Sequence, residues 1–312
     1  MAESEIFELR SSKPSLLMKL GKWLITRGPK VFPQAEEEVA PFLDGRDIPP
    51  DAELSDKIAK RFEVEQWECE GQQCVTLHPL TGRGEQHILY FHGGGFVLPM
   101  LDAHWPLVAA LVDATGASLT VPLYDVVPES CYSAADRLAD GAFARITRDW
   151  APEKVTLCGD SAGGHMALAL ALRQVRAGSP KAGKLALFAP WLDLTLADPA
   201  IQAVEADDIM LRIRVLRPMG KAWAGGRDPA SPECSPLYAS REELAQLPPT
   251  AVFVGRHDLF VVDCRTFAAK MINADNAPEL YEYAGAPHVY MALPFTREAK
   301  DTFRLVDQFM KA

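Results

Sequence analysis

A serine within a glycine-rich turn is the residue best suited to chemistry in this chain. The run GDSAGG at residues 159–164 matches the pattern G-x-S-x-G, between the strand-like run VTLC and the helix-like run HMALALALRQV. In this setting, small neighbours let a serine hydroxyl project from the carboxyl edge of a sheet. The pattern predicts Ser161 as a nucleophile. A turn that binds phosphate at the helix N-terminus is the alternative.

A second glycine turn precedes the serine and suits the oxyanion that a serine nucleophile creates. HGGG at residues 92–95 directly follows the strand-like run ILYF. Glycines let backbone amides approach a substrate oxygen closely. The predicted oxyanion hole uses the amides of Gly94, Gly95 and Ala162, with Gly93 shaping the turn. HGGG alone is a weak signal, and its weight comes from its place after a strand and before the serine.

A serine nucleophile needs a base, and the base needs a carboxylate that holds its tautomer. On folds with this serine turn, the chain order is serine, acid, histidine. Asp258 follows the strand-like run AVFV and His288 follows LYEY, so both are predicted at the carboxyl ends of strands. Asp263 is the rival acid, with helix capping or solvent exposure as its other role. Only His288 follows Asp258 with a strand between them, unlike the competing histidines His78, His87, His104, His165 and His257.

Alternating strand-like and helix-like runs must position these groups. Short apolar runs occur at residues 87–91, 118–124, 155–158, 185–188, 251–254 and 280–283. Helix-like runs occur at 133–149, 163–177, 262–273 and 297–311, and a hairpin from residue 61 turns at 70–73. This alternation is typical of βαβ units. The predicted fold class is therefore α/β, with a mostly parallel, twisted sheet and helices on both faces.

Two stretches interrupt this alternation and are predicted to form a cap. Residues 1–60 are helical or loop-like, broken by prolines, and form the predicted N-terminal cap segment. Residues 61–312 form the predicted catalytic domain, with a cap insertion at about 195–230 that suits one or two short helices. Extra helices that simply cover the core are the alternative.

The first helix-like stretch is amphipathic. Its apolar residues recur every three or four positions and lie mostly apart from the basic residues. We expect this face to cover the acyl pocket as a lid, and sealing of the flank of the core is the alternative. The face consists of Leu16, Leu17, Leu20, Trp23 and Leu24.

Composition narrows the function further. The chain has 42 acidic and 32 basic residues, a net charge of −10, which removes the electrostatic basis for nucleic-acid binding and favours neutral substrates. The N-terminal run MAESEIFELR lacks a secretory signal, and no run reaches the roughly 20 apolar residues of a membrane span, so we expect a cytoplasmic location. The six cysteines lack metal-site spacing and are expected to stay reduced, and no metal is predicted.

Together these motifs resemble the hormone-sensitive-lipase group of α/β-hydrolase carboxylesterases, which includes bacterial esterases, arylacetamide deacetylases and monoterpene lactone hydrolases. The resemblance covers about residues 60–312 and rests on HGGGF, GDSAGG, APWLDLT, SPLY, LPPT and the loops at Asp258 and His288. It implies the α/β-hydrolase fold with a helical cap, no cofactor and a neutral acyl ester as substrate. The chain departs from the family at YDVVPE (124–129), where Y-R-L-A-P-E is frequent, and at DLFVVD (258–263), where D-P-L-x-D-E is common.

The predicted function is hydrolysis of small to medium carboxylic esters or lactones through an acyl-enzyme on Ser161, Asp258 and His288. An amidase or acyl transferase on the same site is the alternative, and a non-catalytic ligand-binding protein is a more distant one. A neutral His288 base predicts activity that falls on acidification, near or somewhat below pH 6.5. A homodimer paired through the last strand is left open. Candidate pocket residues, with core packing as their other role, are Phe96, Trp105, Trp191, Met210, Trp223 and Tyr290.

Overall fold

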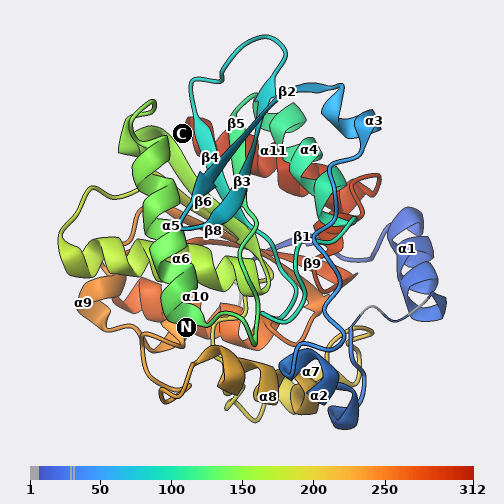
Figure 1. Ribbon diagram of the computed structural model, residues 1–312. Coiled ribbons are helices and arrows are strands. Elements are labelled where there is room, and N and C mark those ends of the chain that lie inside the picture. Colours follow the sequence, from blue (N-terminus) through green and yellow to red (C-terminus); the bar gives the residue numbers. More distant parts are fainter. Residues whose placement is uncertain (1–6, 29, 31) are drawn as a thin grey trace.

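A single twisted sheet organises the molecule (Figure 1). The computed structural model describes residues 7–28, 30 and 32–312, so residues 1–6, part of the run that argued against a secretory signal, lie outside it. The strand order is β1-β9-β8-β7-β6-β4-β5-β3-β2. All neighbours are parallel except β5-β3 and β3-β2, which confirms the mostly parallel sheet. The strands are β1 (Glu8–Ser11), β2 (Phe62–Cys69), β3 (Gln72–Pro79), β4 (His87–Phe91), β5 (Ser118–Pro122), β6 (Val155–Asp160), β7 (Lys184–Phe188), β8 (Thr250–His257) and β9 (Glu279–Pro287).

Helices cover both faces of the sheet, as predicted (Figure 1). On one face lie α5 (Tyr132–Ile146), α6 (Ala162–Ala177) and α10 (Val261–Asn273), and on the other lie α4 (His104–Thr115) and α11 (Arg297–Lys311). The neighbouring residues Ile88 and Leu89 are both fully buried, but they belong to the cores on opposite faces. This two-sided burial is why the parallel strands read as continuous apolar runs.

Strand β1 is absent from the predictions and closes one edge of the sheet. It pairs in parallel with β9, Glu8 lying opposite Tyr281, and an ion pair of 3.0 Å joins Arg10 Nε to Asp301 Oδ2 on α11. The expectation that residues 1–60 are only helical or loop-like is therefore wrong at this strand. The edge of β9 that was considered for a homodimer is already occupied by β1, so the last strand is not available for pairing there.

Helix α1 (Leu16–Arg27) forms where the sequence predicts it, but it faces the opposite way. Its buried residues are Met18 and Gly21, which lie against the body of the protein. The apolar face that was predicted to form a lid is exposed to solvent, at between 46% and 82% of each side chain. The predicted apolar face therefore forms neither a lid nor a seal on the core, whereas Met18, on the inner face of the helix, belongs to the core.

The N-terminal segment and the insertion meet at one end of the molecule, where two hydrogen bonds join them (Figure 1). Gln34 Nε2 donates to the carbonyl of Met210 at 2.9 Å, and Arg214 Nη2 donates to the carbonyl of Gln34 at 3.1 Å. The short elements are η2 (Glu36–Glu38), α2 (Ala40–Leu43), α3 (Asp56–Ala59), η3 (Pro152–Lys154), α7 (Ile201–Glu205), α8 (Ile213–Trp223), η4 (Pro236–Tyr238), α9 (Arg241–Leu244) and η5 (Tyr290–Ala292).

Two further predictions concern cysteines and membrane spans. All six cysteines are free thiols. Among the helices of the described part of the chain, none combines the length and apolar character needed to cross a bilayer.

Candidate active site

Ser161 occupies a strained turn between β6 and α6. Its backbone has φ 54° and ψ −118°, a conformation that residues other than glycine rarely adopt. The turn is tight because the helix starts against the strands: a Cβ atom on Gly163 would clash with the carbonyl oxygen of Phe91. The amide of Ser161 donates to the carbonyl of Phe188 on β7 at 2.9 Å, which holds the turn at the carboxyl edge of the sheet.

His288 and Asp258 form a buried hydrogen-bonded pair at the same edge. Asp258 directly follows β8 and His288 directly follows β9, and both strands run parallel to β6. His288 Nδ1 lies 2.8 Å from Asp258 Oδ2, and the other carboxylate oxygen accepts from the amide of Phe260 at 2.9 Å. Burial alone would lower the pKa of His288, but the Asp258 carboxylate raises it above its ordinary value of 6.5. The pair therefore holds a histidine that is more basic than a free one.

Asp208, from the insertion, supports this pair, and the predictions missed it. Its carboxylate is buried, and Oδ2 accepts from the amide of Leu259, directly after Asp258, at 2.9 Å. Oδ1 accepts from the amides of Met210 and Leu211. Asp208 also contributes to the raised pKa of His288. A lone aspartate in an irregular insertion gives no sequence signal, because its role depends on contacts with a loop 50 residues away.

The HGGG turn presents two amides and uses a third internally. The amide of Gly93 donates to Asp160 Oδ1 at 2.9 Å, which is consistent with the predicted role of Gly93 in shaping the turn. Among the described residues, no acceptor binds the amides of Gly94 or Gly95. The amide of Ala162, the first residue of α6, has no acceptor within the helix. Three amides near Ser161 thus remain free for a ligand.

Asp160 fixes the glycine turn relative to the serine turn. Besides Gly93, its Oδ1 accepts from the hydroxyl of Tyr90. Burial would raise the pKa of Asp160, but the nearby His104 and the hydrogen bond from Tyr90 lower it below its usual range. A charged, buried carboxylate therefore joins residues 90, 93 and 160 into one unit.

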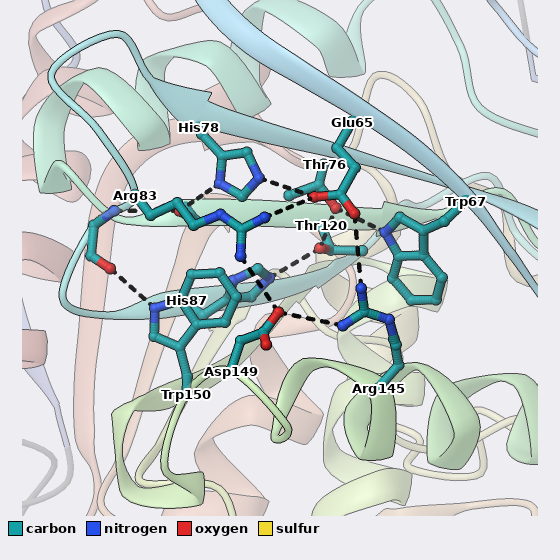
Figure 2. Close-up of polar contacts among 12 residues, drawn as sticks. Glu65, Trp67, Thr76, His78, Arg83, His87, Thr120, Arg145, Asp149 and Trp150 are labelled. Atoms are coloured by element: carbon teal, nitrogen blue, oxygen red, sulfur yellow. Dashed lines mark hydrogen bonds and ion pairs between the residues drawn. The ribbon is translucent and has the colours of Figure 1, made fainter.

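Among the described residues, the side chains of the rival acid and of the rival histidines make no hydrogen bond to Asp258 or His288. Asp263 is almost fully buried in the first turn of α10, its Oδ2 lacks a partner among the described residues, and burial raises its pKa to about 8. It is neither a capping residue bound to the helix nor a solvent-exposed one. His165 Nδ1 lies 3.0 Å from the carbonyl of Trp191, and burial lowers its pKa to about 4. His78 and His87 lie in a separate network around β2 to β5 (Figure 2).

Most of the candidate pocket residues are core residues. Phe96, Trp191 and Trp223 are fully buried, and the rings of Phe96 and Trp223 stack at 4.2 Å. Tyr290 belongs to the core on the other face of the sheet, where its hydroxyl bonds Thr302 Oγ1 at 2.6 Å. Trp105 is also buried, with Nε1 donating to the carbonyl of Ala52. The burial of these five side chains favours core packing, the alternative role that was considered for them.

The side chains that approach the glycine turn come from the N-terminal segment and from the insertion. A Cβ atom on Gly95 would lie 2.8 Å from the ring of Phe32 and 3.5 Å from Met219 Sδ. Met210, the remaining candidate, is half-buried in the same insertion. Within the described ranges, no group of three or more His, Cys, Asp or Glu side chains is placed to hold a metal ion.

Comparison with known proteins agrees with this geometry. Residues 88–292 match the model of a family described as alpha/beta hydrolase fold. An acetyl-hydrolase of Streptomyces hygroscopicus is 33% identical over 65% of this chain and 67% of its own length, and an esterase of Acinetobacter venetianus is 32% identical over 64% and 66%. The chain thus spans about two thirds of the length of these relatives.

Solved structures show the same fold across nearly the whole chain. The crystal structure of an esterase from the bacterial hormone-sensitive lipase family superposes with a TM-score of 0.80, at 22% identity, covering 95% of this chain and 98% of the other. Together with the family match, this result confirms the resemblance that the motifs predicted. The chain belongs to the alpha/beta hydrolase fold family.

Proposed function

We propose that this protein hydrolyses small to medium carboxylic esters or lactones through an acyl-enzyme, with Ser161, Asp258 and His288 as the catalytic triad. The observation that carries this proposal is the common position of the three residues. Ser161 lies on a strained turn at the sheet edge that also holds the His288–Asp258 hydrogen bond of 2.8 Å. The relatives named acetyl-hydrolase and esterase support the same class of reaction.

In the first step, Ser161 Oγ attacks the ester carbonyl carbon. With Nδ1–H donating to Asp258, the neutral His288 ring has Nε2 free to accept the proton of the serine hydroxyl. The carbonyl oxygen becomes negative, and the amides of Gly94, Gly95 and Ala162 are placed to stabilise it. Each such donor is worth about 3–4 kcal/mol of transition-state stabilisation. When the intermediate collapses, His288 returns the proton to the leaving alcohol and the acyl group stays on Ser161.

In the second step, water repeats the attack on the acyl-enzyme. His288 accepts a proton from the water molecule, and the new oxyanion occupies the same three amides. Collapse releases the carboxylic acid and restores the Ser161 hydroxyl. Both steps use the charge of Asp258 to stabilise the imidazolium form of His288, which agrees with the raised pKa of that ring.

A neutral acyl group suits this site best. Asp160, Asp208 and Asp258 are all buried around His288, and an anionic acyl chain would be repelled by these carboxylates. We propose that residues 32–43 together with α7 and α8 form the cap over the site. Phe32, Met219 and the half-buried Met210 would then form its apolar lining. Such a lining excludes water and limits the acyl chain.

Rapid-mixing kinetics with p-nitrophenyl esters of short, medium and long acyl chains test the proposal, beside a lactone and an anilide. We expect a burst of nitrophenol equal to the enzyme concentration, followed by slower turnover, and the highest kcat/KM with short or medium chains. The absence of both burst and turnover with every ester would contradict the proposal. Faster turnover of the anilide than of the esters would assign the site to an amidase.

A further inference from the structure

Helix α1 is held firmly in its outward-facing orientation. Ser15 caps its N-terminus, accepting from the amide of Met18 at 3.1 Å, and the amide of Ser15 donates to Glu298 on α11 at 2.6 Å. Lys22 Nζ donates to the carbonyl of Gly285 at 3.0 Å, at the end of β9. The helix lies at the side of the molecule (Figure 1), and its inner face is small because it passes closest at Gly21. The exposure of its outer face is thus a property of the folded protein.

That outer face carries most of the large hydrophobic side chains that are exposed on the described surface. Nine large hydrophobic side chains are exposed among the described residues, and five of them lie on this one helix. Isolated exposed leucines are ordinary, but a cluster on one helix face marks a surface that binds something apolar. The five side chains, which we call the α1 patch, are Leu16, Leu17, Leu20, Trp23 and Leu24, with exposed fractions of 82%, 46%, 49%, 50% and 51%.

The charges on the segment that carries the α1 patch all have one sign. Residues 13–30 contain five basic and no acidic residues, although the whole chain has a net charge of −10. Arg27 lies over the ring of Trp23 at 4.9 Å, and Lys19 is exposed beside the patch. An open hollow of about 580 Å³ lies next to the helix and is lined by Lys19, Lys22, Arg256 and His257, with one carboxylate, Asp207. Apolar side chains with basic neighbours and a basic hollow are complementary to a partner surface that has an anionic outer layer and an apolar interior.

We propose that the α1 patch binds the surface of an anionic lipid bilayer, with the helix lying along the surface. The leucines and Trp23 would enter the boundary between head groups and acyl chains, and the basic residues would contact phosphate groups. A second copy of this chain is a poorer occupant, because a symmetric contact would bring two sets of five like charges together. Since Lys22 binds Gly285, three residues before His288, bilayer binding would place the carboxyl edge of the sheet near the lipid.

Co-sedimentation with vesicles of equal parts phosphatidylglycerol and phosphatidylcholine tests this inference without relying on hydrolysis. We expect the protein to bind these vesicles, to bind pure phosphatidylcholine far less, and to dissociate as salt is raised. The double variant Leu20→Gln/Leu24→Gln should lose at least about tenfold in partitioning. The Lys19→Gln/Arg27→Gln variant should lose the preference for anionic vesicles.

The matched control is Leu80→Gln, which replaces an exposed leucine (69%) just after β3 and should bind vesicles like the unchanged protein. Turnover of a soluble short-chain aryl ester should be unaltered in all these variants, since none touches the proposed triad. Failure of the unchanged protein to bind anionic vesicles, or equal binding by Leu20→Gln/Leu24→Gln, would overturn the inference. A dimer in analytical ultracentrifugation that this double variant abolishes, without vesicle binding, would assign the α1 patch to a second copy and overturn it as well.

Discussion

Two regions of the molecule each contain a histidine, a serine and a carboxylate. The two regions differ in what surrounds these three residues. At the edge formed by β6, β8 and β9, His288 binds Asp258 near Ser161. Around β2 to β5, His78 Nδ1 lies 2.8 Å from Ser118 Oγ and its Nε2 lies 3.3 Å from Glu65 Oε2 (Figure 2). Residue types alone would describe both as triads.

The second region lacks everything else that the chemistry needs. Ser118 is fully buried at the start of β5, and its hydroxyl also accepts from the amide of Gly84 at 3.3 Å. It has no strained turn, and Arg83 and Arg145 link Glu65 to Asp149 in a network that crosses the outer strands (Figure 2). The neighbouring His87 has its pKa lowered to about 3, by burial first and then by His78 and Arg83. The comparison teaches that a serine nucleophile requires a strained backbone turn, a position at the edge of the sheet and free backbone amides nearby. The same types of side chain inside a sheet only stabilise the sheet.

Replacing each serine should give opposite outcomes. Ser161→Ala should reduce kcat for an aryl ester by about a millionfold, because the nucleophile is lost. Ser118→Ala should leave kcat/KM unchanged but lower the free energy of unfolding by about 1–3 kcal/mol, because His78 and Gly84 lose a buried partner. Steady-state kinetics and urea unfolding measure the two effects. Equal activity in both folded variants would remove the distinction.

Replacing the two carboxylates should separate the regions again. Asp258→Asn should reduce kcat about ten-thousandfold, because His288 is then held in the wrong tautomer. Glu65→Gln, at a partly exposed position, should leave kcat unaltered. If Asp263→Asn proved more damaging than Asp258→Asn, the acid would be the residue in the first turn of α10.

Replacing Asp208 tests whether a residue outside the proposed triad contributes to activity by supporting Asp258 and His288. Asp208→Asn should lower kcat by about 10–100-fold, because the amide of Leu259 loses its acceptor and the loop that carries Asp258 shifts. Loss of the Asp208 charge should also move the inflection of the pH profile to lower pH, since that charge helps to raise the pKa of His288. A lowered kcat with an unmoved inflection would mean that Asp208 acts on packing alone.

The smallest expected effect is the position of the pH profile itself. The base must be neutral, so kcat/KM should rise with pH through the pKa of His288 and then level off. Because Asp258 raises that pKa, the inflection should lie above pH 6.5. The sequence alone predicted an inflection near or somewhat below pH 6.5. Measuring kcat/KM for a soluble ester from about pH 5 to about pH 9 decides this. An inflection below 6.5 would contradict the structural account.

Local patterns predicted several strands, helices and turns of the fold well, because each pattern depends on residues that are close in the sequence. The strand at 87–91 and the helix at 297–311 were predicted at their observed bounds. The hairpin turn was also predicted, and it consists of Glu70 and Gly71, both with positive φ. Glycine turns, strand-like runs and chain order are all readable without knowledge of distant contacts.

The missed features depend on distant contacts. Strand β1 has four residues and exists because β9 and Asp301 lie beside it. Helix α4 has no side-chain cap and is apolar on most sides, so it shows no clear period. The apolar face of α1 was predicted to lie inward on the rule that apolar faces are covered, but the described structure leaves this face exposed to solvent. The aromatic residues near the site were ambiguous because packing and binding use the same side chains.

The most direct test of the central claim is covalent labelling of the nucleophile. The protein is treated with a fluorophosphonate, an electrophile that reacts with activated serines, and the adduct is located by peptide mass spectrometry. The account predicts stoichiometric loss of esterase activity with a single adduct on Ser161, and none on Ser118. An active esterase that carries its adduct on another residue, or that is fully inhibited while Ser161 stays unmodified, would contradict it.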